Sequence, residues 1–287
     1  MTLLLPAPPS FNYFITNEDS PSAAASYGTL VTASGTVNTK GSWVAVHSSI
    51  AYDLYVHDIF FSAGGVGNAS TRNLVDLGIG PDASNVTVKA ENLCADNTGG
   101  TGSVAGMLSG GRVYMQVPLY VSAGTQLWAR AQSNTASKTL RVAVCSWGAP
   151  DHPESYPKIG FIESLGETLA STSGTAITPG ASGALGTSTS LGSFTNDVCA
   201  VFMTMSSDSG TLTAVAYVGA LTTDATATVQ ELGLCCTMCG NASEEVRCQS
   251  TVVWCDIPAG QVVGGRMSCT GTANATMWEM AYGCVRA

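Results

Sequence analysis

The chain carries little charge and almost no histidine. Of its 287 residues only 11% are Asp, Glu, Lys or Arg, and three are histidines, whereas about one quarter of an ordinary globular chain is charged. The carboxylates are scattered, and the sequence contains no G-x-S-x-G elbow, no H-E-x-x-H and no P-loop. We therefore expect a protein that is not an enzyme and that has no cofactor and no metal site.

Basic stripes and long apolar runs are also missing. The 11 Lys and Arg residues are outnumbered by 20 Asp and Glu residues, giving a net charge of -9 and a pI near 4.6. Nucleic-acid affinity comes largely from basic side chains that displace counterions, so no nucleic-acid partner is expected. No apolar run approaches the roughly 20 residues that a membrane helix needs, so we expect no membrane partner.

The N-terminal segment differs from the rest of the chain. Its first residues have no basic region and contain prolines 6, 8 and 9, so the sequence predicts no signal peptide and folding in the host cytoplasm. Residues 1–25 are predicted to form an extended arm that lies along another subunit, with a disordered tail as the alternative. The aromatic content of the arm argues against disorder. Its candidate interface residues are Phe11, Tyr13, Phe14 and Ile15.

The sequence does contain a repeat of itself, which is typical of duplicated modules. Four blocks recur in the same order, at offsets that change only where a loop differs in length. In the first block, Thr29-Leu30 and Ser34-Gly35-Thr36 recur as Thr168-Leu169 and Ser173-Gly174-Thr175. In the second and third blocks, Gly41-Ser42-Trp43 recurs as Gly192-Ser193-Phe194, and Ile79-Gly80 recurs as Val218-Gly219. In the fourth block, Val121-Ser122-Ala123-Gly124 and Arg130 recur as Ile257-Pro258-Ala259-Gly260 and Arg266.

These blocks predict four segments. After the arm, residues 26–148 form a first β-sandwich, residues 149–159 a stiff proline-rich linker, and residues 160–287 a second β-sandwich. Short runs of alternating apolar and polar residues, separated by Gly, Ser, Thr and Asn turns, predict strands throughout. The expected fold is all-β, with two tandem β-sandwich, jelly-roll-like domains; sequence does not separate a jelly roll from an immunoglobulin-like sandwich.

The ten cysteines are unevenly placed, since eight of them fall in the second repeat. Three interpretations stay open: buried free thiols, disulfides within or between chains, and a zinc site. Cys236 and Cys239 have Cys-x-x-Cys spacing, but no second such pair follows, which disfavours zinc. The candidate disulfide or buried-thiol positions are Cys235, Cys236, Cys239, Cys248, Cys255, Cys269 and Cys284.

The stretch from Tyr120 to Ala136 resembles a sequence pattern found in structural proteins of tailed bacteriophages. There an apolar residue followed by Pro or Ala, Gly and Thr leads into a strand and a short polar turn, and Ile257-Pro258-Ala259-Gly260 is similar at its start. The resemblance covers about 20 residues of each repeat. It implies a virion β-module such as a capsid decoration (cement), collar or fibre protein.

Three functions are weighed on this basis. The first is a capsid decoration protein that bridges neighbouring subunits of the shell. The second is a neck, collar, tail-fibre or baseplate component, and the third is a module that binds carbohydrate on the host surface. The expected location is the virion, the expected partners are the major capsid protein or neck proteins, and the chain itself is expected to form a homo-oligomer, with a trimer as the working hypothesis.

Overall fold

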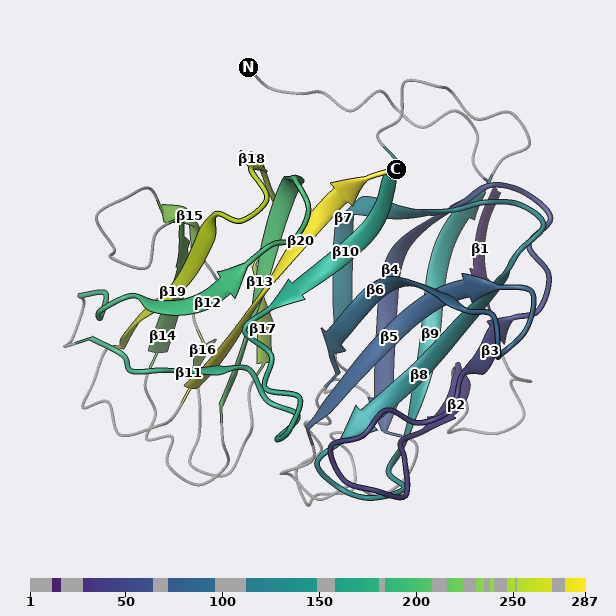
Figure 1. The fold of residues 1–287 in the computed structure, drawn as a ribbon, viewed down its shortest axis with the longest axis horizontal. Helices are drawn as coiled ribbons and strands as arrows, with labels where there is room; N and C mark the ends of the chain where they lie inside the picture. The colour runs from purple at the N-terminus through teal and green to yellow at the C-terminus, as the bar shows by residue number, and fades with distance from the viewer. Residues whose placement is uncertain are drawn as a thin grey trace.

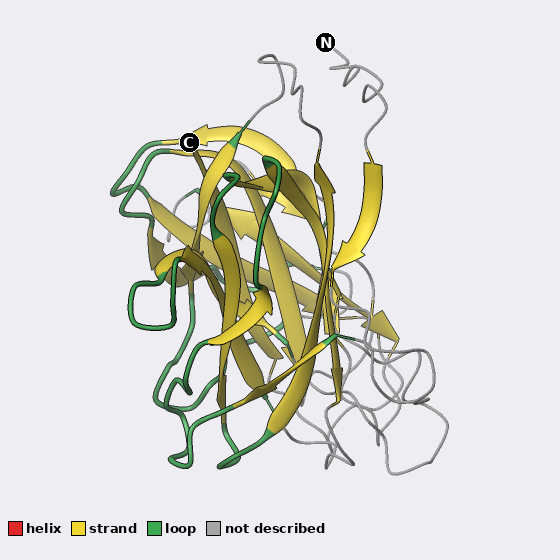
Figure 2. Cartoon of the chain, turned by 90° about the vertical axis from the view of Figure 1, so that its right-hand side faces the viewer, coloured by secondary structure: helices red, strands yellow, loops and turns green. Residues whose placement is uncertain are grey.

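The computed structural model shows a chain built from β-strands. It describes residues 12–16, 28–63, 72–95, 112–148, 158–180, 184–207, 216–223, 231–234, 238–239, 247–250, 252–269 and 277–287. Figure 2 shows these segments as strands joined by loops, with no helix among them. Accordingly, the described residues include no helix of the length and apolarity that spanning a membrane requires. The prediction of an all-β fold is confirmed.

Residues 29–148 carry eight strands that form the first jelly roll. The strands are β2 (Thr29–Thr32), β3 (Val44–His47), β4 (Leu54–Ala63), β5 (Asn73–Gly80), β6 (Thr87–Cys94), β7 (Arg112–Val121), β8 (Gln126–Ser133) and β9 (Thr139–Gly148). They pair antiparallel as a nested hairpin: β2 with β9, β3 with β8, β4 with β7, and β5 with β6. Rolling up this hairpin gives two sheets, β2-β9-β4-β7 and β3-β8-β5-β6, which is jelly-roll topology.

The second half of the chain repeats this arrangement. Its strands are β11 (Thr175–Ile177), β12 (Thr189–Ser193), β13 (Val198–Ser207), β14 (Ala216–Thr222), β15 (Glu231–Leu234), β16 (Met238–Cys239), β17 (Arg247–Gln249), β18 (Val253–Ile257), β19 (Val262–Cys269) and β20 (Met277–Arg286). The nested pairs are β11 with β20, β12 with β19, β13 with β18, and β14 with β15. The short strands β16 and β17 add to β14 and β13.

One turn shows the equivalence of the two jelly rolls at atomic detail. After β7, the backbone N–H of Ala123 donates to the carboxylate of Asp53 at 2.9 Å. After β18, the N–H of Ala259 donates to the carboxylate of Asp197 at 2.8 Å. The next residue of each turn is a glycine with positive φ, 79° and 81°, a conformation that glycine adopts without steric cost. The two turns therefore have the same construction.

Each jelly roll is preceded by one further strand, and the second of these joins the two halves. Strand β1 (Asn12–Thr16) runs antiparallel to β9, and β10 (Ile159–Leu165) runs antiparallel to β20. The other edge of β10 pairs in parallel with β6 and β7 of the first jelly roll. One 15-stranded sheet consequently runs through both halves (Figure 1). Residues 149–157 of the predicted linker lie outside the described residues.

The middle sheet of β10, β20 and β13 is buried on both faces. Phe202 and Tyr282 pack in the first hydrophobic core, whereas Met203 and Ala281, which are their neighbours along the strands, pack in the second. Burying one large apolar side chain stabilises a fold by about 1.5–3 kcal/mol. Separating the two jelly rolls would expose Phe202 and Tyr282, so the halves are held together by a shared core as well as by a shared sheet.

Candidate functional site

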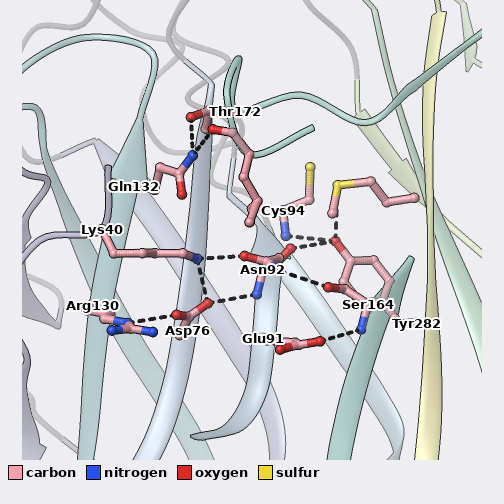
Figure 3. Close-up of polar contacts among 12 residues, drawn as sticks. Lys40, Asp76, Glu91, Asn92, Cys94, Arg130, Gln132, Ser164, Thr172 and Tyr282 are labelled. Atoms are coloured by element: carbon pink, nitrogen blue, oxygen red, sulfur yellow. Dashed lines mark hydrogen bonds and ion pairs between the residues drawn. The ribbon is translucent and has the colours of Figure 1, made fainter. Parts of the chain in front are cut away.

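The most densely bonded polar group of the described chain lies where the two jelly rolls meet, and Asn92 is at its centre (Figure 3). The backbone N–H of Asn92 donates to Asp76 Oδ1 at 2.8 Å, and its carbonyl accepts the hydroxyl of Tyr282 at 3.0 Å. Its side-chain oxygen accepts Lys40 Nζ at 2.7 Å, and its Nδ2 donates to Ser164 Oγ at 3.0 Å. Every polar group of this buried residue has a partner, drawn from both halves of the chain.

The backbone of Asn92 explains why an asparagine stands here. Its φ is +50°, in the left-handed region that asparagine tolerates better than most residues. The ladder between β5 and β6 shifts register at this point, between the pairs Val75–Leu93 and Leu77–Ala90. A bulge of this kind redirects a side chain, and here it directs the amide of Asn92 towards β10.

Asp76 anchors the first-jelly-roll side of the junction. Its carboxylate is 2% exposed and forms ion pairs with Lys40 Nζ at 2.6 Å and Arg130 Nε at 2.8 Å. The guanidinium of Arg130 also stacks over the ring of Trp43, 4.5 Å from its centre. Burial lowers the pKa of Lys40, while the charge of Asp76 opposes this shift. Removing one partner of such a set leaves a buried charge uncompensated, so the three residues act as a unit.

A second set of bonds fixes the turn at residues 168–173 to the first jelly roll. Thr172 Oγ1 donates to Asn38 Oδ1 at 2.8 Å and accepts Gln132 Nε2 at 2.9 Å. Asn38 Nδ2 donates to the carbonyl of Ala170 at 2.5 Å, and Gln132 Nε2 also donates to the carbonyl of Leu169. Two side chains of the first jelly roll thus hold three residues of the second.

Two glutamates lie at neighbouring positions of β6 and β10, next to Asn92 and Ser164 along the chain. Glu91 and Glu163 occupy neighbouring positions of β6 and β10, one residue beyond the pair Ala90–Ile162. Glu91 accepts the backbone N–H of Ser164 at 3.3 Å, and burial raises its pKa. Glu163 is 5% exposed and accepts the N–H groups of the turn at residues 195–196. Both carboxylates are engaged in holding backbone, which is a structural use of acidic residues.

Glu279 is the one carboxyl that the described residues leave unsatisfied on both oxygens. It lies on β20, is completely buried, and faces the second sheet of its jelly roll. The backbone approaches it closely at Gly219 and Gly265, where an added Cβ would lie within 3 Å of a carboxyl oxygen. Burial raises the pKa of Glu279 well above its ordinary value, because the charged form is disfavoured away from water.

The predicted cysteine positions fall into two groups. Cys235 and Cys236 lie outside the described residues, while Cys239 and Cys248 lie on β16 and β17 with side chains that the structure does not describe. The other three candidates, Cys255, Cys269 and Cys284, are described; Cys269 and Cys284 are buried and Cys255 is partly buried.

Three thiols of the second half lie close together. Cys199, Cys255 and Cys284 are free thiols, and Cys199 Sγ lies 3.2 Å from the carbonyl of Cys284. Burial raises the pKa of Cys255 to about 11 and also raises that of Cys284, with a smaller contribution from the neighbouring thiols. In the part of the chain that the structure describes, no three His, Cys, Asp or Glu side chains are arranged to hold a metal ion.

The predicted interface arm is partly described. Tyr13, Phe14 and Ile15 lie on β1, whose backbone pairs with Trp147, Ser146 and Cys145 of β9 in the same chain. Phe11 lies outside the described residues. The segment is therefore extended, as expected, and one of its edges is used within the molecule. Its contact with another subunit stays a prediction.

The junction residues were not among the positions singled out from the sequence. A signal was present at Asp76, which interrupts the apolar run Leu74-Val75-Asp76-Leu77-Gly78 within one strand. A charged residue is seldom fully buried unless it is paired, so this position indicated a buried ion pair. Its partners, at positions 40 and 130, are too far away in sequence to be identified from the pattern alone.

Comparison with known proteins yields no family. No protein-family model matches the chain, and no curated protein matches it either. Among solved structures, PNGF-II is 8% identical with a TM-score of 0.37; the alignment covers 94% of this chain and 65% of that one, so the chain spans under two thirds of its length.

Two further structures show the range of the likeness. The tandem CBM22 domain of Xyn10C from Paenibacillus barcinonensis is 11% identical with a TM-score of 0.25, covering 97% of this chain and 92% of that one. Infectious bursal disease virus, Gx strain, is 8% identical with a TM-score of 0.24, covering 95% and 71%. At these TM-scores and identities, none of the three likenesses carries an argument about this chain.

Proposed function

We propose that the protein is a structural component of a virus particle and contributes to its outer shell. The observation that carries this proposal is the junction: two jelly rolls are fixed to each other by a continuous sheet, a shared core and a buried polar network centred on Asn92. Jelly rolls are a recurrent architecture of capsid proteins, although the fold by itself does not decide function. A rigid two-module body is what a load-bearing shell requires.

The composition supports the same role. Only 11% of the residues are charged, so the chain has few charged groups to desolvate against a neighbour, and uncharged polar groups cost less to desolvate. The described carboxylates at the junction hold backbone or balance cations instead of facing a cleft. These features favour packing between proteins over catalysis.

Within the virion we propose that the chain acts as a decoration protein on a tailed-phage capsid, where it bridges neighbouring capsomers. A second candidate is a building block of the shell itself, which the fusion of two jelly rolls into one body favours. A neck, collar, tail-fibre or baseplate position is the remaining structural alternative. Copy number separates these positions, because neck and collar components occur in small rings.

The experiment is to purify intact particles and count this chain relative to the major shell protein by quantitative mass spectrometry. Hundreds of copies beside a more abundant shell protein support decoration, and a count that makes this chain the main shell protein supports the second candidate. Six or twelve copies assign it to the neck or collar. Absence of the chain from purified particles contradicts the whole proposal.

A carbohydrate-binding function is favoured by one observation only. Trp254 on β18 exposes 45% of its surface and lies beside the exposed Asp256, and sugar sites combine exposed aromatic rings with polar groups. Titration of the isolated chain on a glycan array, with Trp254→Ala as the matched variant, tests it. Binding that the variant loses supports this function, and an array without any bound glycan excludes it for the glycans present.

A further inference from the structure

The strands that precede the two jelly rolls are counterparts of each other. In β1, Ile15 lies opposite Cys145 of β9, and in β10, Ile162 lies opposite Cys284 of β20. A phenylalanine precedes the isoleucine in both strands. Strands β9 and β20 are themselves counterparts, since each is the last strand of its jelly roll. The same residues therefore occupy the same register in the two halves.

The two strands differ in what lies along their second edge. Strand β10 is covered there by the first jelly roll, with Ile159 paired to Leu119 of β7 and Ile162 paired to Ala90 of β6. Strand β1 pairs with β9 alone among the described strands and ends the order of the large sheet. The chain thus uses this type of strand once as an internal connector and once as a sheet edge.

The complementary edge lies at the opposite end of the molecule. Strands β18 and β15 are the counterparts of β7 and β6, and β18 pairs with β13 alone among the described strands. Figure 1 shows β18 and β15 at one end and β1 at the other. An uncovered strand edge offers unpaired backbone groups to another strand. Trp254, on this edge, is 45% exposed.

A groove marks the same place. In the first jelly roll, Lys158 Nζ lies 4.5 Å from the ring centre of Tyr120, so the residue before β10 covers that site. The turn equivalence makes Asp256 the counterpart of Tyr120. In the second jelly roll, Asp256 lines an open groove together with Cys199 and Arg286. The site that Lys158 covers at Tyr120 in the first half therefore corresponds to the open groove at Asp256 among the described residues of the second half.

We propose that β1 of one copy of this chain adds in parallel to the β18 edge of a second copy, as β10 adds to β7 within the chain. The register follows from the internal pairing. Tyr13 is the counterpart of Ile159: Tyr13 faces Trp147, and Ile159 faces Arg286, the counterpart of Trp147, because a bulge lies between Ile159 and Phe161. Cys255 is the counterpart of Leu119, so Tyr13 of one copy lies beside Cys255 of the next. The interface is head-to-tail, and its rotation decides whether copies close into a ring or continue as a filament.

The contact concerns two copies of the same chain and does not depend on the proposed virion role. Its test uses full-length Tyr13→Cys, assembled at high protein concentration and oxidised with diamide at pH 8.5. Neighbouring strands are about 4.8 Å apart, which lies within the Cα separation of a disulfide. We expect disulfide-linked dimers and higher multiples on a non-reducing gel, with a peptide linking positions 13 and 255 in the mass spectrum.

Two variants serve as controls. Adding Cys255→Ser to Tyr13→Cys removes the partner thiol and is expected to abolish the linked bands. Asn12→Cys places a thiol one residue away, on the other face of the strand, and is expected to link roughly tenfold more slowly. Because the other native cysteines remain present in both, the comparison isolates the pair at 13 and 255.

Three results would overturn the interface. They are a monomer by light scattering at every concentration, a cross-link from position 13 to a different cysteine, and equal linking by Asn12→Cys. A measurement on the unaltered protein gives a second reading: amide exchange in β18 must slow when the protein assembles, and unchanged exchange there contradicts the proposal. None of these outcomes depends on whether the chain is found in a virion.

Discussion

The hydroxyl of Tyr282 lies between two backbone groups of a strand that is almost 190 residues away in sequence. It donates to the carbonyl of Asn92 and accepts the N–H of Cys94, both at 3.0 Å. Tyr282 is on the last strand of the second jelly roll, and the two backbone groups belong to β6 of the first. The ring itself stacks on Phe202, with centres 4.8 Å apart. One side chain thus joins a core contact to a hydrogen-bonded contact between the halves.

Tyr282→Phe is expected to reduce the free energy of unfolding by about 1–3 kcal/mol, because it leaves buried backbone groups without their partner. The aromatic stacking with Phe202 is kept, so the change isolates the hydroxyl. Guanidinium unfolding of the full chain measures it. Tyr52→Phe, at a residue that is 45% exposed, is the control and should shift stability by less than about 0.5 kcal/mol. Equal effects of the two variants would refute the role given to this hydroxyl.

Asn92→Ala is expected to cost about 2–4 kcal/mol, since it removes two side-chain hydrogen bonds and puts alanine in a left-handed conformation. Asn92→Gly removes the same bonds but adopts the positive φ without strain. It should therefore be about 1 kcal/mol more stable than Asn92→Ala in the same unfolding assay. A glycine variant that is no better than the alanine variant would show that the backbone is not strained here.

Asp76→Asn is expected to destabilise the fold by about 3–5 kcal/mol, because Lys40 and Arg130 would lose the carboxylate that balances them in a buried site. Asp82→Asn serves as the matched control: Asp82 is exposed and bonds only within its own turn, to Ser84 and Asn85. Thermal unfolding of both variants at low and high salt measures the difference. If salt weakens the wild type markedly more than it weakens Asp76→Asn, the ion pairs are screened by solvent and our account of the junction fails.

The raised pKa of Glu279 predicts how the free energy of unfolding depends on pH. Its folded-state pKa is raised, so above about pH 4.5 the native state binds more protons than the unfolded state. Stability is then full below the unfolded-state pKa and decreases as the pH rises towards the folded-state pKa. Glu279→Gln removes the titrating carboxyl, so the free energy of unfolding of the variant is expected to decrease less between pH 5.5 and 8. A smaller decrease remains because burial also raises the pKa values of Glu91 and Glu167.

Unfolding midpoints measured across that pH range test the prediction. Asp82→Asn is again the control, because the pKa of Asp82 is lowered by its hydrogen bonds and it titrates below the range. A wild type that becomes more stable from pH 5.5 to 8, or a glutamine variant with an unchanged slope, would contradict the raised pKa of Glu279.

Much of the fold was predictable because its signals are local. Alternation of apolar residues identifies strands, and the repeated turn after Val121 and Ile257 identifies the duplication; both turns have matching backbone bonds. The match of Ile79-Gly80 with Val218-Gly219 falls on counterpart strands but out of register. The ladders pair Gly78 with Trp128 and Thr222 with Gly264, so it is Thr222 that corresponds to Gly78. The similar residues at these two positions therefore suggested an alignment of the two strands that differs from the one the ladders give.

The junction was not predictable in the same way, because its energy comes from contacts between distant segments. Only Asp76 stands out in its local sequence; Lys40 and Asn92 lie in polar or mixed sequence, and Ser164 and Tyr282 are 72 and 190 residues away from Asn92. Strand propensity even disfavours asparagine. These side chains meet only in the folded chain, and the sequence pattern does not indicate which distant strand supplies each partner.

The position of β10 has a consequence for the newly made chain. Strands β6 and β7 are complete once residue 121 has been synthesised, yet their covering strand begins only at Ile159. During that interval the first jelly roll emerges from the ribosome with two bare edges, which invite pairing with other nascent chains. If the first half is expressed alone, these edges stay uncovered, so we expect it to aggregate. A longer version that includes residues 149–165 supplies β10 and is expected to be more soluble.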